Sequence, residues 1–325
     1  MATILVTGGA GYIGSHACKA LKKAGHLPVT YDNVSTGWRD AVRFGPLEEG
    51  DLTDRSRLDQ VLAEWKPDAV LHFAALSNVG EATRKPGLYW RNNVGGSLTL
   101  LEAMTAAGIA KIVFSSTCAV YGECDRPAET TTFSPLNAYG GSKAAVERML
   151  ADFRAAHGLR SVSFRYFNVA GADAEAEIGE AHDPETHLIP LAIQAATGRR
   201  DALSVFGTDY DTPDGTCIRD YVHVEDLVDA HLRGLDYLGA DGAETTFNLG
   251  TGRGFSVREV ICEVGEVLGT AVPHVEAPRR IGDATALVSG SDLALKELGW
   301  RAERSTLPQM ISSAIAWHQK GGGYS

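Results

Sequence analysis

The sequence predicts an α/β protein built on a doubly wound parallel sheet, followed by a smaller mixed α/β region. Short β-type apolar runs alternate with longer helical stretches through the first half of the 325 residues, and a glycine cluster follows the first apolar run. The fraction of glycine, 36 of 325 residues, also exceeds the ~7% average of soluble proteins, and proline shows no matching excess. Strands that alternate with helices at this spacing are typical of βαβ units, whose helices cover both faces of a parallel sheet.

The elements expected in the first half follow this rhythm. Gly25, Gly108 and Gly158 each come just after a helical stretch, where a left-handed residue commonly ends a helix. We therefore expect residues 1–169 to form the main sheet domain. Its strands are expected at residues 3–7, 29–31, 69–73, 111–115 and 161–167, and its helices at 13–24, 56–65, 88–107 and 138–157.

The regular alternation of expected strands and helices becomes less clear beyond residue 170. Residues 172–184 are polar and irregular, and Pro213-Asp214-Gly215 marks a turn. We expect residues 170–325 to form a smaller region that is interleaved with the sheet. Helices are expected there at 188–197, 224–238, 257–268 and 307–318, and a strand at 246–249.

Charge and cysteine content exclude several classes of protein. Thirty basic against 41 acidic residues give a net charge of −11, which disfavours nucleic acid and anionic membranes as partners. The five cysteines are scattered without CxxC spacing, so we expect reduced thiols and neither a disulfide framework nor a zinc site. No apolar run reaches the ~18 residues of a membrane span. These features predict a cytoplasmic enzyme or binding protein, and we expect no metal site.

A glycine-rich turn lies between the first expected strand and helix. In Thr7-Gly8-Gly9-Ala10-Gly11-Tyr12-Ile13-Gly14, the glycines at 8, 11 and 14 allow a tight turn and let a pyrophosphate approach the helix N-terminus. Asp32 ends the second expected strand, where a carboxylate accepts hydrogen bonds from a ribose 2′-hydroxyl and repels a 2′-phosphate. The pattern favours NAD over NADP, and the alternative is a plain βα turn with a solvated aspartate.

Tyr139 and Lys143 are four residues apart near the start of an expected helix, and so lie on one face. They fall at the edge of the stripe expected to be buried, which is formed by Val146, Leu150 and Phe153. An ammonium beside a phenol lowers the phenol's pKa, so Tyr139 is a candidate base near neutral pH. The alternative is a tyrosine packed at a helix start beside a lysine that extends to solvent.

Ser115-Ser116-Thr117 ends the preceding strand, at the sheet edge where ligands bind in open α/β folds. With these residues the chain resembles the extended short-chain dehydrogenase/reductase family, in particular its UDP-sugar 4-epimerases such as those acting on UDP-glucose. The resemblance runs along almost the whole chain. It is carried by TGGAGYIGSH from Thr7, HFAAL from His72, NNV from Asn92, FSSTCAVYG from Phe114, YGGSK from Tyr139, RYFNVAGA from Arg165, THLIP from Thr186, DGTCIRDYVHVEDL from Asp214, NLGTG from Asn248 and APRRIGD from Ala277.

The resemblance implies a Rossmann-like NAD-binding domain over 1–169 and a mainly UDP-sugar-binding region over 170–325. It implies that Tyr139 removes the proton of the sugar 4-hydroxyl while a hydride passes from C4 to NAD and later returns to the opposite face. Lys143 would hold the nicotinamide ribose, and Thr117 would bind the reacting hydroxyl. A homodimer is implied by the resemblance alone.

The resemblance also assigns the ligand contacts. The residues it assigns to NAD are Gly8, Gly11, Tyr12, Ile13, Gly14, Asp32, Asn33, Ser35, Thr36, Gly37, Asp51, Leu52, Phe73, Ala74, Ala75, Ser77, Asn93, Ser115, Lys143 and Phe167. Those it assigns to the UDP-sugar are Thr117, Tyr139, Asn168, His187, Leu188, Ser204, Val205, Phe206, Arg219, Arg280, Asp283 and Leu287.

The residue types leave several of these assignments open. Arg219 and Arg280 suit a diphosphate, yet either could be a surface ion-pair partner. Asp283 could accept from ribose hydroxyls or cap a turn, and His187 could be a polar residue at a helix start. Asp51 could face an adenine ring or cap the next helix.

Two positions depart from the family pattern. Ser77 stands where many such epimerases have lysine, so one charged contact is absent. Leu287 stands where tyrosine or cysteine often walls the sugar pocket, and its intermediate bulk leaves acceptance of N-acetylated sugars open.

The same residues also bear on three alternative functions. A 4,6-dehydratase typically carries Asp-Glu after the strand-end threonine, whereas this chain has Cys118-Ala119. Epimerases of UDP-xylose/UDP-arabinose or of UDP-N-acetylglucosamine share every catalytic residue and remain alternatives. A non-catalytic NAD-binding regulator is disfavoured because both residues of the YxxxK pair are present.

Overall fold

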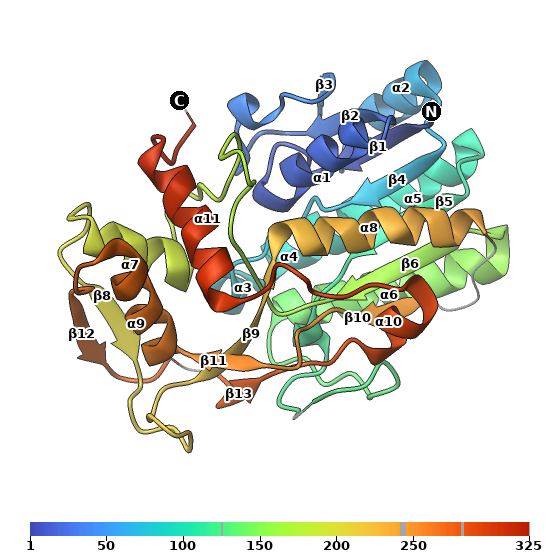
Figure 1. Ribbon diagram of the computed structural model, residues 1–325. Helices are drawn as coiled ribbons and strands as arrows, with labels where there is room; N and C mark the ends of the chain where they lie inside the picture. The colour runs from blue at the N-terminus through green and yellow to red at the C-terminus, as the bar shows by residue number, and fades with distance from the viewer. Residues whose placement is uncertain (125, 241–244, 281–282, 325) are drawn as a thin grey trace.

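The computed structural model describes residues 1–124, 126–240, 245–280 and 283–324, and its centre is a seven-stranded parallel sheet (Figure 1). The strand order is β10-β6-β5-β4-β1-β2-β3. From β1 the chain builds outward on one side and then on the other, so the predicted doubly wound sheet is confirmed. The strands are β1 (Thr3–Thr7), β2 (Leu27–Asp32), β3 (Leu47–Glu49), β4 (Ala69–His72), β5 (Lys111–Ser115), β6 (Arg160–Arg165) and β10 (Thr246–Asn248).

Helices cover both faces of this sheet because neighbouring residues of each strand point to opposite sides. In β1, Ile4 and Val6 pack into the core under α1 and α8, while Leu5 packs into the core under α2, α5 and α6. All three side chains are at most 3% exposed. The helices around the sheet are α1 (Tyr12–Lys23), α2 (Arg55–Trp65), α3 (Val79–Arg84), α4 (Pro86–Tyr89), α5 (Gly96–Ala107), α6 (Ala138–His157) and α8 (Val224–Gly239), with short 3-10 turns at Arg39–Ala41 and Cys118–Val120.

A third core lies beside the main sheet, where α7, α9 and α11 pack around small sheets (Figure 1). Strands β7, β9, β11 and β13 form one of these sheets, and β8 pairs with β12 in the other. The bounds are β7 (Asn168–Ala170), β8 (Leu203–Phe206), β9 (Ile218–His223), β11 (Gly254–Ser256), β12 (His274–Ala277), β13 (Ala286–Leu287), α7 (Leu188–Ala196), α9 (Val257–Leu268), α10 (Asp292–Leu298) and α11 (Leu307–Gln319).

The chain beyond residue 170 also contributes to the main sheet. β10 pairs in parallel with β6, and α8 packs beside α1 on the same face. The two regions are therefore interleaved in space. The boundary between residues 169 and 170 remains a prediction.

The helix predicted at 88–107 is confirmed as a continuous helical stretch, which contains a π-helical turn that was not predicted. It consists of α4, a π-helical turn (Trp90–Gly95) and α5. The π turn brings Asn93 inward, where its amide donates to Leu76 O and Ser142 Oγ, both at 3.0 Å, and its Oδ1 accepts from Leu76 N at 2.9 Å. Periodicity alone misses this turn because an inserted residue disturbs one turn without changing the apolar pattern on either side.

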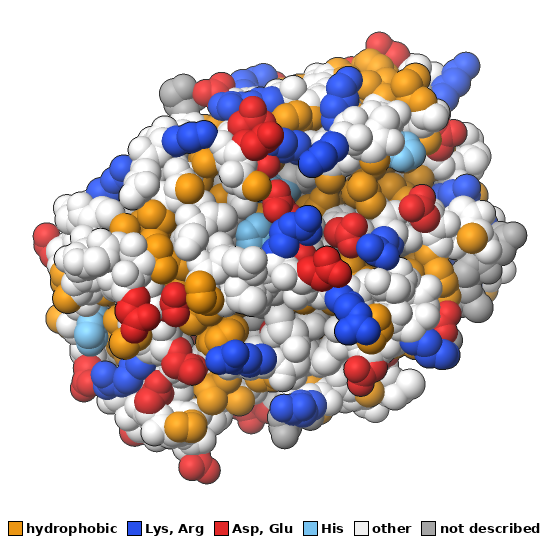
Figure 2. All heavy atoms as spheres, viewed as in Figure 1, with side chains coloured by type: hydrophobic (Ala, Val, Ile, Leu, Met, Phe, Trp, Pro, Cys, Tyr) orange, Lys and Arg blue, Asp and Glu red, His pale blue; other side chains and the backbone are white. Residues whose placement is uncertain are grey.

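Charges of both signs are interspersed on the face shown in Figure 2. The acidic excess therefore does not gather into one patch on that face. Among the helices of the described residues, none combines the length and apolarity needed to cross a bilayer.

Candidate functional site

The glycine-rich turn after β1 presents bare backbone at the start of α1. Gly8 has φ of +76°, and a Cβ there would lie 2.6 Å from Ala74 N. A Cβ at Gly14 would lie 2.1 Å from Gly8 O. Gly11 precedes α1 and has no side chain to cap it, so the first N–H groups of the helix are free for a ligand. This is the arrangement in which a helix N-terminus receives a pyrophosphate.

Asp32 lies at the end of β2, beside this turn. Its two carboxylate oxygens accept from Ala10 N at 3.0 Å and Val34 N at 2.8 Å, and each retains a lone pair for a further donor. Burial raises the pKa of Asp32, while the two backbone hydrogen bonds lower it in part. A carboxylate fixed in this position fits an unphosphorylated ribose and opposes a 2′-phosphate.

Asp51 does not cap the following helix. Asp54 does, by accepting from Arg57 N at 3.0 Å. Asp51 instead accepts from the backbone and hydroxyl of Thr53 at 2.8 and 2.6 Å and from Asn33 Nδ2 at 2.7 Å. Burial would raise the pKa of Asp51, but these hydrogen bonds lower it overall. The interaction with Asn33 joins two residues that were both assigned to the cofactor.

Beneath the turn, the end of β4 is held by a buried histidine. His72 pairs with Thr7 Oγ1 at 2.7 Å and with Ser97 Oγ at 2.8 Å, and burial followed by the charge of Lys143 lowers its pKa to about 3. His72 is therefore neutral and structural. Of the assigned residues after it, Phe73, Ala74 and Ala75 are partly buried and Ser77 is exposed.

Tyr139, Thr117 and Lys143 come together at the carboxyl edge of β5. Asn137 begins α6 by accepting from Gly140 N at 3.0 Å, which places Tyr139 in the first turn. The Thr117 hydroxyl is close enough to the Tyr139 phenol to lower its pKa. Lys143 is only 3% exposed, and its Nζ donates to Ser115 O at 2.7 Å. The predicted position of both residues at the buried edge of one helix face is confirmed by this geometry.

The predicted lowering of the Tyr139 pKa is wrong. Burial raises the pKa of Tyr139, the hydrogen bond from Thr117 opposes this in part, and nearby Cys118 adds to the increase. The ammonium of Lys143 is bonded to a backbone carbonyl and lies 4.8 Å from the centre of the Phe114 ring. Burial lowers the pKa of Lys143 to about 7, so the charge expected to favour the phenolate is itself weakened near neutral pH.

A buried ion pair supports this edge, and the sequence analysis did not find it. Glu147 accepts from Ser116 Oγ at 2.5 Å and forms an ion pair with Arg165 at 2.5 Å, with both side chains at least 93% buried. The Glu147 charge also acts against the lowering of the Lys143 pKa. The only available signal was the spacing of Glu147 one turn after Lys143, which is too common to be informative.

Five residues assigned to the UDP-sugar gather around β8, β9 and β13. Arg219 donates to the carbonyls of Ile218 and Ala284 at 2.8 and 2.9 Å and pairs with Asp283 at 3.4 Å. Leu287 in β13 lies opposite Arg219 in β9. The guanidinium of Arg280 lies 3.9 Å from the centre of the Phe206 ring in β8. These contacts bring two cations, a carboxylate and an aromatic face into one neighbourhood.

The remaining residues assigned to the UDP-sugar can be described by their exposure and their position in an element. The side chain of Val205 is 1% exposed and belongs to the third core, so only its backbone is available to a ligand. Ser204 and Phe206 on either side of it are partly exposed. Leu188 is the first residue of α7, whose N-terminal N–H groups are unpaired within the helix. Asn168 is partly buried at the start of β7.

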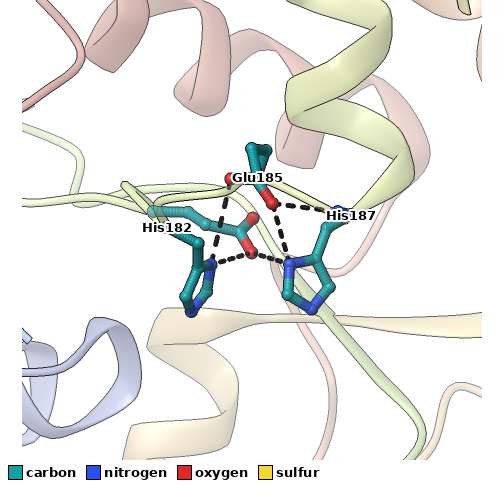
Figure 3. Close-up of side chains that lie close together, drawn as sticks. His182, Glu185 and His187 are labelled. Carbon is teal, nitrogen blue, oxygen red and sulfur yellow. Dashed lines mark hydrogen bonds and ion pairs between the residues drawn. The ribbon is translucent and has the colours of Figure 1, made fainter. Parts of the chain in front are cut away.

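His187, which precedes α7, is part of a cluster that sequence analysis missed. Its Nδ1 lies 2.8 Å from Glu180 Oε1 and 3.0 Å from Glu185 Oε1, and His182 lies across the same carboxylates (Figure 3). The spacing E-x-H-x-x-E-x-H was the available signal. Because Nδ1 is engaged in this way, His187 has only its other ring nitrogen to offer a nucleotide.

Hollows in the surface do not by themselves point to this site. One of about 810 Å³ lies among α9, α10 and the start of α11, and none of the assigned residues lines it. A smaller one of about 340 Å³ is lined by Glu123, Cys124 and residues 284–286, which adjoin Asp283 and Leu287. We give more weight to the second, because the polar and charged groups described above converge beside it.

Comparisons with known proteins agree with this arrangement. Residues 4–250 match the NAD dependent epimerase/dehydratase family. The UDP-glucose 4-epimerase of Rhizobium leguminosarum bv. trifolii is 53% identical over 320 residues, which cover 98% of each chain. The crystal structure of UDP-glucose 4-epimerase from Brucella ovis in complex with NAD is 47% identical, with a TM-score of 0.94 and coverage of 97% of this chain and 98% of that one.

A further solved structure adds a ligand of another type. The UDP-glucose 4-epimerase from Stenotrophomonas maltophila, with bound NAD and formylated UDP-arabinopyranose, is 41% identical, with a TM-score of 0.94 and coverage of 99% of both chains. The family match spans most of this chain, and the full-length relative is more than half identical. The chain therefore belongs to the NAD-dependent epimerase/dehydratase family and, within it, to the UDP-glucose 4-epimerases.

Proposed function

We propose that this chain interconverts UDP-glucose and UDP-galactose with NAD as its bound cofactor. The observation that carries the proposal is the grouping of Tyr139 and Thr117 with buried Lys143 at the carboxyl edge of the sheet, together with the glycine-rich turn. The relatives named above are UDP-glucose 4-epimerases, and two of them hold NAD. Residues 1–169 would bind NAD, and residues 170–325 would supply most contacts to the UDP-sugar.

The fit to NAD depends on three features of the chain. A side chain at Gly8 or Gly14 would collide with backbone, the α1 N-terminus is uncapped, and Asp32 keeps acceptor capacity on both oxygens. When bound, NAD supplies a hydride acceptor for sugar C4 and a positive ring charge that favours the ionised phenol. Lys143 would hold the adjacent ribose through the ammonium hydrogens not used by Ser115 O.

The chain's own residues would then move one proton. Thr117 holds the sugar 4-hydroxyl against Tyr139, and Tyr139 takes its proton as general base. The same phenol returns a proton to O4 after the sugar presents the other face of C4. Glu147 opposes part of the effect of burial on the pKa of Lys143, and so favours the charged lysine during this cycle.

We propose that UDP is held by the residues around β9. Arg219 and Arg280 present guanidinium groups suited to a diphosphate, and Asp283 presents acceptors for ribose hydroxyls. Asp283 pairs with Arg219 at 3.4 Å, a distance longer than a strong charge-assisted hydrogen bond. The pair can therefore open at low cost when the nucleotide arrives.

The test is to supply UDP-galactose, UDP-arabinose and UDP-N-acetylgalactosamine separately and to follow formation of the 4-epimer without added cofactor. Turnover of UDP-galactose at the highest kcat/KM is the expected result. A folded, NAD-loaded sample that turns over none of the three would refute the proposal. Preference for UDP-arabinose would favour the second candidate, a UDP-pentose 4-epimerase, which the ligand of the Stenotrophomonas maltophila structure makes worth testing.

We also propose a homodimer, which is supported by exposed apolar side chains near the site. Trp90 is 44% exposed, Leu98 39% and Leu136 54%, and a Cβ at Gly141 in α6 would lie 3.4 Å from the Trp90 ring. Sedimentation of the wild type and of Trp90→Glu tests this, since a charge at the interface should yield monomers. A cytoplasmic location is supported by the cysteines, none of which forms a disulfide.

A further inference from the structure

We infer that Glu180, His182, Glu185 and His187, called here the His-Glu quartet, form a binding site for one divalent transition-metal ion such as Zn²⁺. The quartet lies in the segment between β7 and α7. Figure 3 shows the two imidazole rings facing each other across the carboxylates. One donor atom from each residue can be chosen so that all four lie within 4.8 Å of one another.

The distances within the quartet suit a tetrahedral ion. Glu180 Oε1 lies 3.1 Å from His182 Nδ1 and 2.8 Å from His187 Nδ1, and Glu185 oxygens lie 3.8 and 3.0 Å from the same two nitrogens. A regular tetrahedron with metal–ligand bonds of about 2.0–2.1 Å has edges of roughly 3.3 Å. Two imidazoles with two carboxylates suit zinc and its first-row neighbours better than calcium or magnesium, which prefer oxygen alone.

A second observation points to a missing ligand. The Nδ1 atom of His182 is shut off from solvent and has no partner in hydrogen-bond geometry, although Glu180 lies close to it. A buried polar atom without such a partner is uncommon in a folded protein. Because this atom faces the other three donors, an ion among them would satisfy it. His182 and His187 remain 33% and 44% exposed, which leaves a path for entry.

A neighbouring carboxylate cluster differs from the quartet because it already surrounds a lysine ammonium. Asp173, Glu175 and Glu177 also converge, but Lys19 Nζ already lies among them at 2.8, 2.5 and 2.7 Å. Among the ion pairs of the described residues, the cationic partners of Glu180 and Glu185 are the two imidazoles alone. A divalent cation that displaces two imidazolium protons leaves the net charge of the quartet unchanged.

The bound ion would join two ligand-binding segments. Tyr12, at the start of α1, packs edge-on against His182 with ring centres 6.4 Å apart, and its hydroxyl donates to Gly171 O at 2.5 Å. His187 immediately precedes α7, whose first residue is assigned to the UDP-sugar. An ion fixed by the quartet would hold the approach to α7 against the glycine-rich turn.

Protons compete with the ion for the two imidazoles. Burial lowers their pKa values, but Glu180 and Glu185 raise them overall, to about 9 for His182 and about 10 for His187. Tyr12 from α1 and His318 from α11 are titratable groups that interact with the carboxylates of the quartet. Metal affinity should therefore increase as the pH rises from 6.5 to 8.5.

The experiment uses the full chain without a polyhistidine tag, treated with a chelator and dialysed against Zn²⁺ at pH 8. We expect one zinc ion per chain, release of about two protons on binding and a melting temperature raised by a few degrees. His182→Gln and Glu185→Gln should each weaken zinc binding at least tenfold. Exposed His274→Gln and the carboxylate control Glu175→Gln should bind zinc as the wild type does.

Two outcomes overturn the inference. If the wild type retains no zinc, the quartet is an ion-pair cluster only, and if His182→Gln and Glu185→Gln bind zinc as tightly as the controls, the ion sits elsewhere. Circular dichroism checks that the variants fold. Should either variant unfold, Co²⁺ added to the wild type decides the question, because a tetrahedral site gives intense visible absorption and an octahedral aquo ion does not.

Discussion

Replacing Tyr139 by phenylalanine separates the chemistry of the site from its stability. The change removes one hydroxyl and leaves the ring in place. If Tyr139 is the general base, turnover should fall by about 10²- to 10⁴-fold, which corresponds to roughly 3–5 kcal/mol in the activation free energy.

The expected cost in stability is much smaller. The lost hydroxyl interacts with Thr117, and even a full hydrogen bond there would contribute only about 1 kcal/mol to the free energy of unfolding. For a chain of this size that corresponds to a decrease in melting temperature of only a few degrees. NAD content should be unchanged, since the phenol does not support the glycine-rich turn.

The matched control is Tyr89→Phe. Tyr89 is fully buried, and its hydroxyl donates to the backbone carbonyl of Asn78 at 2.7 Å. This variant should lose similar stability and keep most of its activity. The assay is single-turnover epimerisation of UDP-galactose by protein with measured NAD content. If Tyr139→Phe retains more than about a tenth of the wild-type rate, or if both variants lose activity equally, the assignment of Tyr139 as base is refuted.

Three further predictions concern stability, pH and specificity. Glu147→Ala leaves Arg165 buried without its partner and should lower the free energy of unfolding, measured in urea, by about 3–5 kcal/mol. Asp152→Ala removes an exposed ion pair and should lower it by no more than about 0.5 kcal/mol. Equal losses in the two variants would contradict this prediction. The pKa of Lys143 is about 7 in the folded chain and ordinarily 10.5, so between these pH values the unfolded chain binds more protons than the folded chain. In this pH range the free energy of unfolding of the wild type should therefore rise by about 1.4 kcal/mol per pH unit relative to Lys143→Met. A constant difference between pH 7 and 10 would remove this linkage. Leu287→Cys should raise the kcat/KM ratio of UDP-N-acetylgalactosamine to UDP-galactose by about tenfold, and an unchanged ratio would place Leu287 outside the sugar pocket.

Features that depend on neighbours in the chain were predictable. The glycine-rich turn is recognisable because a tight βα turn needs Gly8 and Gly14 whatever surrounds it. Tyr139 and Lys143 share a helix face because they are four residues apart, and the apolar stripe at Val146 and Leu150 fixes which face is buried. The alternation of strands and helices predicted the parallel sheet for the same reason, since each element is a local pattern.

Features that depend on distant segments were not predictable. Glu147 and Arg165 meet only because α6 packs beside β6, and Arg219 meets Asp283 only because β13 pairs with β9. The pKa of Tyr139 shows why this matters. The sequence placed a lysine one turn away and so predicted a lowered pKa, but several packed elements bury the phenol and raise its pKa instead.

The sequence by itself thus determined the fold class, the dinucleotide turn and the residues of the candidate catalytic helix, because short-range spacing specifies turns and helix faces. Only the tertiary structure decided which charges are neighbours and how strongly each is buried. It brought together the His-Glu quartet, whose spacing is visible in the sequence but whose four side chains converge only in the folded chain between β7 and α7. Electrostatic energy depends on distances through space and on burial, and neither is written in the order of residues.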